Sequence, residues 1–203
     1  MTVNLTLPDT NLNPESNLYT IVDWLEFTVH NYTLSDTIIY LLNLEEQDFS
    51  EIPGGKNGYK NQQLWREGNI FILYNDKPEH DRMGIHIIIS GTGCRYYEQK
   101  KNLREMMANV MAFEHLYKFT RIDLAIDDRS GNVINFDRIA KAEEKSTISS
   151  LWYKTTYLRE KRINDGIVIG KTLYFGSKKS KIFMRIYDKH LEQQKRKQHN
   201  KRE

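Results

Sequence analysis

The stretch that decides the fold is KTLYFGSKKSKIFMRIYDK, residues 171–189. Its alternation predicts two strands joined by a basic turn, because successive side chains of a strand point to opposite faces. One face of the second strand is apolar and suited to a core, with Ile182, Met184 and Ile186. The other face carries Phe183, Arg185, Tyr187 and Lys189.

Tyr187 therefore lies between two cations, Arg185 and Lys189, on the predicted outer face. A free phenol titrates near pH ~10, and neighbouring positive charge favours the phenolate. This setting suits a tyrosine that attacks a phosphodiester. The alternative is that Tyr187 is an ordinary half-buried strand tyrosine with solvated neighbours.

Outward from this stretch, the patterns predict an α+β fold, with a mainly antiparallel central sheet packed against two or three helices. The expected strands are 21–29, 58–65, 69–74, 84–90, 121–127, 150–158 and 167–175. The expected helices begin near Leu34, span about 100–117 and follow Asn135 as N-cap. Residues 90–93 are expected to form a sharp turn. We predict a mobile arm at 1–20, one domain at 21–190 without an internal linker, and a basic tail at 191–203.

Composition limits the class of protein. The chain has 203 residues, 39% hydrophobic and 28% charged, and no apolar run near the roughly 20 residues that cross a bilayer. A single cysteine, Cys94, excludes an internal disulfide and a cysteine-based zinc cluster. The absence of a secretory signal pattern favours the cytoplasm and no membrane partner.

The net charge of +3 is unevenly distributed. Residues 178–203 hold ten Lys/Arg and three Asp/Glu, whereas the remainder holds 20 bases and 24 acids. This asymmetry favours a polyanionic partner for the C-terminal end. The alternative is a solvated tail. Aromatic residues among the bases from Trp152 to Phe183 are consistent with stacking on unpaired bases.

The second informative motif is RIDLAIDD, residues 121–128, which places Asp123 and Asp127 on one strand face. At i and i+4 these carboxylates lie roughly 13–14 Å apart, too far to share an ion on a regular strand. One of them could join a histidine or carboxylate of a neighbouring strand to hold a divalent ion. His86 is a candidate if its strand lies beside this one. The alternative is a solvated face on which Arg121 and Asp123 balance each other.

With these segments together, the chain resembles the Rep_trans family, the rolling-circle plasmid replication initiators and related relaxases of conjugative elements. The resemblance covers about Asp23 to Lys189. It is carried by residues 22–25 (VDWL), 90–95 (SGTGCR), 121–128 (RIDLAIDD), 172–177 (TLYFGS) and 185–189 (RIYDK).

The resemblance implies sequence-specific nicking of one origin strand, with a tyrosine joined to the 5′ phosphate and a divalent metal, Mg or Mn, assisting. It aligns the nucleophile with Tyr187, with Tyr174 as the competitor, and Arg185 and Lys189 beside it. The metal residues align with Asp123, Asp127 and His86. Expected DNA-binding residues are Arg95, Tyr174, Lys178, Lys179 and Lys181.

The expected partners are origin DNA, single-stranded or extruded as a hairpin, a host helicase and a second copy in a homodimer. Two departures from the family pattern stand out. The chain ends at Glu203, before an expected further strand, and Ile88 occupies a position where an acid is expected. A metal-site carboxylate is therefore expected to be missing. The alternatives are an origin-binding protein of the same descent that does not cut DNA, and a regulatory α+β protein with a basic tail.

Overall fold

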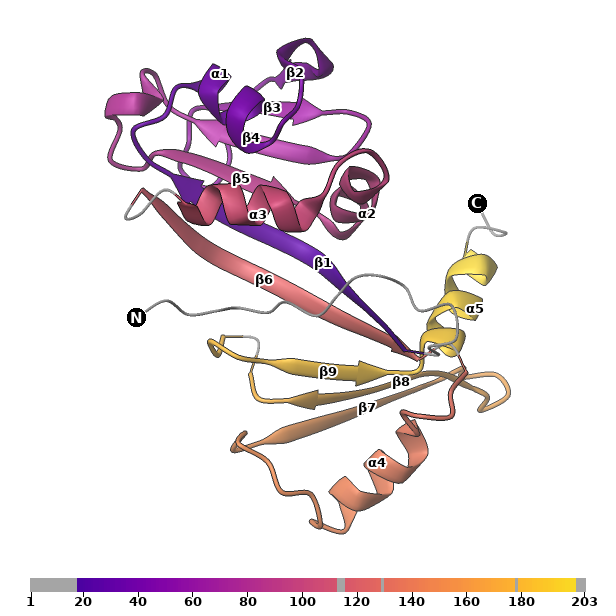
Figure 1. Cartoon of the computed structure of the whole chain (residues 1–203). Coiled ribbons are helices and arrows are strands. Elements are labelled where there is room, and N and C mark those ends of the chain that lie inside the picture. Colours follow the sequence, from indigo (N-terminus) through magenta and orange to yellow (C-terminus); the bar gives the residue numbers. More distant parts are fainter. Residues whose placement is uncertain (1–17, 113–115, 129, 178, 200–203) are drawn as a thin grey trace. The chain divides into compact units, whose positions relative to one another are not determined.

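The computed structural model describes residues 18–112, 116–128, 130–177 and 179–199, and the chain divides into two compact units, residues 1–129 and residues 130–203 (Figure 1). The sequence showed no linker at this boundary. The first strand begins at Leu18, so residues 18–20 of the expected arm belong to the sheet.

The first unit is built on a six-stranded sheet of order β2-β3-β4-β5-β1-β6. Each neighbouring pair is antiparallel. The strands are β1 (Leu18–Val29), β2 (Phe49–Ile52), β3 (Asn61–Trp65), β4 (Ile70–Tyr74), β5 (Ile85–Ile89) and β6 (Tyr117–Asp128). As its apolar sequence predicts, β5 is buried along its whole length and lies inside the sheet.

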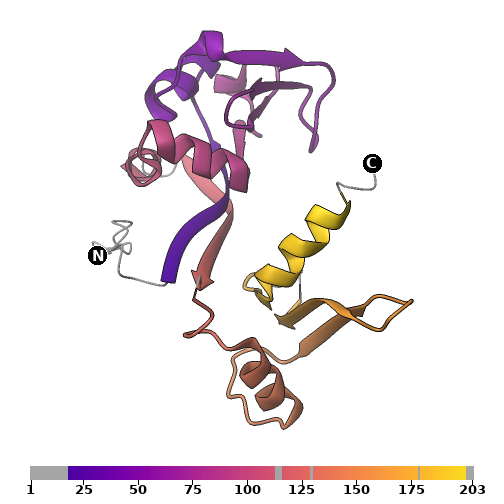
Figure 2. The same cartoon turned by 90° about the vertical axis from the view of Figure 1, so that its right-hand side faces the viewer.

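Helices cover one face of this sheet (Figures 1 and 2). They are α1 (Leu34–Asp36), the π-helical turn η1 (Thr37–Leu41), α2 (Gly91–Lys100) and α3 (Leu103–Ala112). Short 3-10 turns lie at Glu46–Asp48 and Pro78–His80. The core between helices and sheet is apolar and includes Leu25, Phe27, Ile38, Leu41, Ile87, Tyr97, Met106 and Val110.

Two expectations for this region were wrong. Residues 91–93 open helix α2 instead of a turn, because the Ser90 hydroxyl accepts a hydrogen bond from Gly93 N and caps the helix. Gly93 is required there, since a Cβ would lie 2.6 Å from the carbonyl oxygen of Gly68. The second error is one of bounds: the helix expected at about 100–117 is present as α3, Leu103–Ala112, and Tyr117 begins β6.

Strand β6 forms an edge of the sheet and is longer than the pattern at 121–127 indicates. Tyr117 and Phe119 pack against the core. Further along, Ile122, Leu124 and Ile126 are 44%, 67% and 58% exposed. Alternation assigned these three side chains to one face, but it could not tell how far the helices extend over that face.

The second unit has a three-stranded antiparallel sheet, β7 (Thr155–Lys161), β8 (Val168–Phe175) and β9 (Met184–Tyr187). Helix α4 (Phe136–Glu144) packs on one face, through Phe136 against Tyr157 and Lys171 against Asp137. Asn135 caps α4 as predicted, accepting from Arg138 N.

Helix α5 (Lys189–His199) follows β9 and contacts β8. The expected hairpin of residues 171–189 is present as β8 and β9, with Leu173 paired to Ile186. Ile182, however, is 72% exposed in the connecting loop. The strand begins only at Met184, so this residue does not join the core.

The α+β prediction with a mainly antiparallel sheet is confirmed. Among the described residues, no helix has both the length and the apolar character needed to span a membrane.

Candidate functional site

Strand register gathers polar side chains on the face of the six-stranded sheet opposite α2 and α3. On β1, Leu25 and Phe27 point into the core, so Glu26 between them points to the other face. Directly paired residues of antiparallel strands share a face. Thr28 pairs with His86 of β5, while Glu26 and Trp24 pair with Arg121 and Asp123 of β6. We call this group the polar cluster: Trp24, Glu26, Thr28, His86, Arg121 and Asp123.

Glu26 is the centre of the polar cluster. Its side chain is 19% exposed, and its Oε1 accepts a 2.6 Å hydrogen bond from Trp24 Nε1. Its Oε2 lies 3.5 Å from His86 Nε2, and its Oε1 lies 3.9 Å from an Nη of Arg121. One carboxylate therefore connects side chains of three strands.

His86 is buried and held from two sides. Its Nδ1 is 3.0 Å from Thr28 Oγ1, and the Tyr59 ring stacks on its ring at 6.1 Å. Burial lowers the pKa of His86 below its usual value, although the Glu26 carboxylate opposes this shift. The neutral imidazole that results is the form that binds metal ions.

Asp123 is engaged by Arg121. The guanidinium donates to both carboxylate oxygens, at 3.0 Å from Nε and 2.6 Å from Nη2, and raises its own pKa through this contact. Asp127 lies four residues further along β6; the register shift beside this stretch inserts its extra residue, Asp23, on β1, so it does not bring Asp127 closer to Asp123 along β6. Within the described ranges, no group of three His, Cys, Asp or Glu side chains is placed to hold a metal ion.

The sequence motifs do not mark Glu26 as a site residue. His86 was a candidate if its strand lay beside residues 121–127; in the structure β1 lies between β5 and β6. Ile88, where an acid was expected, is the direct partner of Glu26 in the β1–β5 pair. The carboxylate of Glu26 thus lies on the neighbouring strand, directly across from Ile88. The signal that could have identified Glu26 is its place on the even-numbered face of β1.

Arg95, an expected DNA-binding residue, lies on α2 and forms a 2.8 Å ion pair with Asp23. Both side chains are about half exposed. A register shift between Val22 and Trp24 places Asp23 at this position, beside Gly91. Arg95 is therefore separate from the polar cluster, on the helix-covered side of β1.

In the second unit, Tyr187 is a half-buried residue at the end of β9. The guanidinium of Arg185 lies over its ring, 4.4 Å from the centroid. The strand ends there, two residues before Lys189, which is the first residue of α5, so the alternation expected to place Lys189 on the face of Tyr187 does not extend to it.

Tyr174, the competing nucleophile, lies on the same sheet face, because it pairs with Arg185 while Thr172 pairs with Tyr187. Its ring stacks against Phe183 at 5.6 Å and 21°. Lys179 and Lys181 are exposed in the adjoining loop. Lys178 lies outside the described residues. The face carrying both tyrosines is thus aromatic and basic.

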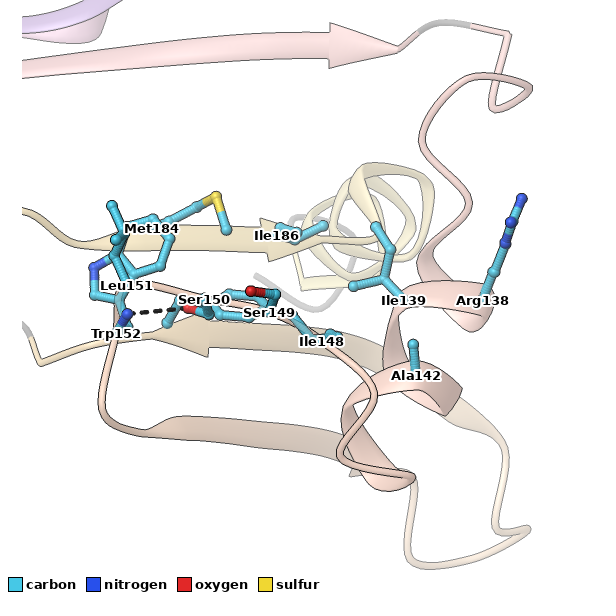
Figure 3. Close-up of a pocket in the computed structure, with 11 residues that line it drawn as sticks. Arg138, Ile139, Ala142, Ile148, Ser149, Ser150, Leu151, Trp152, Met184 and Ile186 are labelled. Atoms are coloured by element: carbon cyan, nitrogen blue, oxygen red, sulfur yellow. Dashed lines mark hydrogen bonds between the residues drawn. The ribbon is translucent and has the colours of Figure 1, made fainter.

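An apolar groove of about 500 Å³ lies on the opposite face of this sheet (Figure 3). It is lined by Ile139 and Ala142 of α4, by Met184 and Ile186 of β9, and by the loop that ends at Trp152. None of the expected site residues lines it. Since Tyr187 and Ile186 point to opposite faces, we do not assign the groove to chemistry at the tyrosine.

Comparison with known proteins gives two family matches along the chain. Residues 19–113 match the rolling circle replication initiation protein N-terminal domain, and residues 117–202 match the replication initiation factor family, Rep_trans. The chain belongs to the rolling-circle replication initiators. The resemblance predicted from the sequence motifs is confirmed.

Two individual relatives agree with this assignment. "Putative DNA relaxase NicK" of Bacillus subtilis is 30% identical over 184 residues, which is 88% of this chain. The chain spans 50% of the length of that relative. The rolling circle replication initiator protein of Geobacillus stearothermophilus superposes with a TM-score of 0.75 at 29% identity, over 87% of this chain and 69% of that one.

Proposed function

We propose that this chain nicks one strand of DNA at a replication or transfer origin through a covalent 5′-phosphotyrosine at Tyr187. The observation that carries the proposal is the position of Tyr187 at the end of β9, on the aromatic and basic face of β8 and β9, with the Arg185 guanidinium over its ring. Membership among the rolling-circle initiators supports the reaction class.

The reaction is a transesterification. The phenol oxygen of Tyr187 forms a bond to phosphorus, the bond from phosphorus to the 3′ oxygen breaks, and that oxygen leaves as a 3′ hydroxyl after it takes a proton. The phosphodiester energy is kept in the tyrosyl ester, so the nick can later be resealed. Arg185 lies close enough to the ring to stabilise charge on the attacked phosphate.

The same face is suited to single-stranded DNA. The stacked rings of Tyr174 and Phe183 offer an aromatic surface for an unpaired base, and Lys179 and Lys181 offer charge for the phosphates. In this reading Tyr174 binds DNA and does not attack it. Lys189 and Arg95 remain proposed phosphate contacts.

A divalent ion fits the polar cluster in part. His86 Nε2 and Glu26 Oε2 lie 3.5 Å apart on one face, and these two side chains would be the first candidates to hold the ion. Asp123 would be the third donor, once it leaves Arg121. Asp127 is too far along β6 to join them on the regular strand. An imidazole among the donors favours Mn²⁺ over Mg²⁺, which prefers oxygen. When bound, the ion would neutralise charge on a phosphate oxygen.

The partners that follow are origin DNA, single-stranded or extruded as a hairpin, and a helicase that unwinds the nicked duplex. A homodimer remains a proposal as well. In this proposal the DNA is the substrate and the helicase acts after the nick, so the reaction can be tested with the chain and an oligonucleotide.

The test uses a single-stranded oligonucleotide spanning the nick region of the replicon's own origin, with Mn²⁺. A 3′ label should become attached to the protein, because the tyrosine retains the 5′ phosphate of the downstream fragment. A 5′ label should appear on a shorter strand that a polymerase can extend. Tyr187→Phe should abolish the adduct, and the matched variant Tyr174→Phe should retain it. An adduct that persists in Tyr187→Phe would show that the nucleophile is another residue.

A second candidate function is origin binding without cleavage. It is favoured by the observation that no three metal-binding side chains converge within the part of the chain that the structure describes. In the same experiment it predicts a sequence-dependent complex that dissociates in detergent and leaves the oligonucleotide intact.

A further inference from the structure

The turn between β7 and β8 carries an isoleucine that the proposed function has not used. Ile163 is 99% exposed, and Ile167 on the other side of the turn is 52% exposed. A single apolar side chain on a protein surface is common and needs no explanation by itself. Two further features distinguish this one: the turn is closed by polar contacts, and its neighbours are basic.

The turn is held closed without the side chain of Ile163. The Arg162 amide donates to the Ile167 carbonyl at 2.8 Å, and the Gly166 amide donates to the Arg162 carbonyl at 2.9 Å. The Asp165 carboxylate accepts from the Ile167 amide at 3.0 Å and pairs with the Arg162 guanidinium at 2.7 Å. Gly166 supplies the positive φ of 70° that the turn requires. Ile163 is thus presented to solvent on a fixed support.

The hairpin around the turn has excess positive charge. Arg159 and Lys161 are exposed on β7. One acid of the hairpin, Glu160, pairs with Lys195 of α5 at 2.7 Å, and the other is the aspartate that pairs within the turn. Because each acid is neutralised by a base, Arg159 and Lys161 leave the hairpin positively charged. Such a surface attracts a polyanion.

An apolar tip beside cations on a two-stranded ribbon suits a groove of duplex DNA. Ribbons of this kind enter either groove. Minor-groove binders insert apolar wedges, isoleucine among them, between base steps, while Lys and Arg contact the phosphates. A protein partner fits less well. A stable protein interface buries about 800 Å² on each side and is depleted in lysine, whereas this tip offers two isoleucines among charged residues.

Strand register gives the distance from the tip to the proposed nucleophile. Tyr187 pairs with Thr172 of β8, and the turn ends at Ile167, five residues earlier in the same chain segment. At about 3.3–3.4 Å per residue, the tip is roughly 17 Å from Tyr187 along the sheet. This distance corresponds to about five base pairs of duplex. DNA held at Tyr187 in an unpaired loop can therefore reach the hairpin with its stem.

We propose that the β7–β8 hairpin is a duplex wedge: Ile163 enters a base step in the stem of an extruded origin hairpin, and Arg159 and Lys161 contact the flanking phosphates. The step lies about five base pairs from the nick. Only this placement relative to the nick rests on the proposed function of Tyr187; the binding of duplex DNA does not. The phosphate contacts carry no sequence preference, and the inserted isoleucine favours steps that unstack easily.

The first measurement is the affinity of the full chain for a DNA stem–loop by fluorescence anisotropy, with Tyr187→Phe in every protein to prevent cleavage. The stem has about ten base pairs, one helical turn, and the loop carries the nick region of the replicon's own origin. Ile163→Ser should bind this DNA about fivefold to tenfold more weakly, because unstacking the base step offsets part of the gain from burying an isoleucine. Its affinity for the loop sequence as a single strand should be unchanged.

Leu151→Ser is the matched control. Leu151 is fully exposed in the loop that precedes β7, at the end of the strand away from the turn. The replacement removes an exposed branched side chain of the same size as that of Ile163, and it should leave both affinities unchanged. Since both side chains lie in solvent, melting curves of the two variants should match that of the unmodified chain.

The second measurement locates the wedge in the stem. 2-Aminopurine, a fluorescent analogue of adenine, becomes brighter when it loses stacking, and it is placed at one stem position at a time. Binding of the Ile163 protein should brighten it at a step roughly five base pairs from the nick. Ile163→Ser should bind without this brightening.

The third measurement concerns the two exposed bases. Replacing Arg159 and Lys161 together by Met should reduce the slope of log affinity against log salt concentration by about two, because each phosphate contact contributes roughly 0.9 to this slope. An unchanged slope for the stem–loop would exclude these two residues as phosphate contacts and overturn the proposal as stated.

Equal stem–loop affinity of Ile163→Ser and Leu151→Ser overturns the wedge, as does an equal loss of affinity for the single strand. Brightening that Ile163→Ser retains overturns it too. If light scattering shows that Ile163→Ser abolishes self-association while stem–loop affinity is kept, the tip is a contact between copies and the proposal is wrong. If the wedge is found but the chain with its native Tyr187 forms no covalent adduct with origin DNA, the nicking function fails while the role of the hairpin stands.

Discussion

Replacing Glu26 by Gln tests the candidate metal site most directly. The amide keeps the length of the side chain and an oxygen that can accept from Trp24 Nε1, the 2.6 Å hydrogen bond of the native residue. It removes the charge beside His86 Nε2, at 3.5 Å, and Arg121, at 3.9 Å. The substitution therefore separates charge from packing.

The expected loss of Mn²⁺ affinity follows from the position of the carboxylate. Two unit charges 4 Å apart interact by about 4 kcal/mol at the effective dielectric constant of a site near a protein surface. The carboxylate is 19% exposed and Arg121 competes for it. We take about 2–3 kcal/mol as the remaining effect, which corresponds to a roughly 30-fold to 150-fold weaker Kd.

Titration of each protein with Mn²⁺ measures this ratio, and a urea unfolding curve measures stability in parallel. Glu51→Gln on the edge strand β2 is the matched control, since it removes an exposed acid from the same sheet. It should leave the Kd unchanged, and the free energy of unfolding of Glu26→Gln should fall by no more than about 1 kcal/mol. A Kd for Glu26→Gln within twofold of the native value would refute the assignment of Glu26 as a metal ligand.

Three further predictions concern the folded state. Burial raises the pKa of the Cys94 thiol to about 12, so an aromatic disulfide reagent at pH 8 should modify it only after denaturant is added; rapid labelling of the native protein would contradict this burial. Burial lowers the pKa of His86 from 6.5, so as the pH falls the unfolded chain takes up this proton before the folded protein does. Stability should therefore decrease below about pH 6.5, and less steeply in His86→Gln. Parallel pH profiles of stability for the two proteins would contradict this prediction. Asn135→Ala removes the cap of α4 and should cost about 1 kcal/mol in urea unfolding, whereas an unchanged midpoint would mean that α4 does not depend on its cap.

Much of the fold followed from local patterns. The alternation in residues 171–189 predicted β8 and β9, the apolar run at 84–90 predicted an interior strand, and Asn135 predicted the start of α4. These features depend on the residues of one segment and on the period of its side chains. The turn predicted at residues 90–93 was wrong. The Ser90 hydroxyl accepts a hydrogen bond from Gly93 N, so the same glycines begin a helix.

The sequence predicted one part of the candidate site, and the other part could be seen only in the structure. Tyr187 and Arg185 are two residues apart on one strand, so alternation alone placed them on one face. Glu26, His86 and Asp123 lie far apart in the sequence, and their proximity depends on β1 being inserted between β5 and β6. Strand order is not encoded in any single segment.

The sequence by itself determined the family, the antiparallel α+β architecture and the face on which Tyr187 lies, because each follows from motifs and from the two-residue period of a strand. Only the tertiary structure decided that Glu26 lies directly opposite Ile88, and that Arg121 engages Asp123. Both contacts depend on cross-strand pairing, because sheet order and register fix which residues face each other. Order and register in turn follow from burial of the whole core, and not from the paired residues themselves.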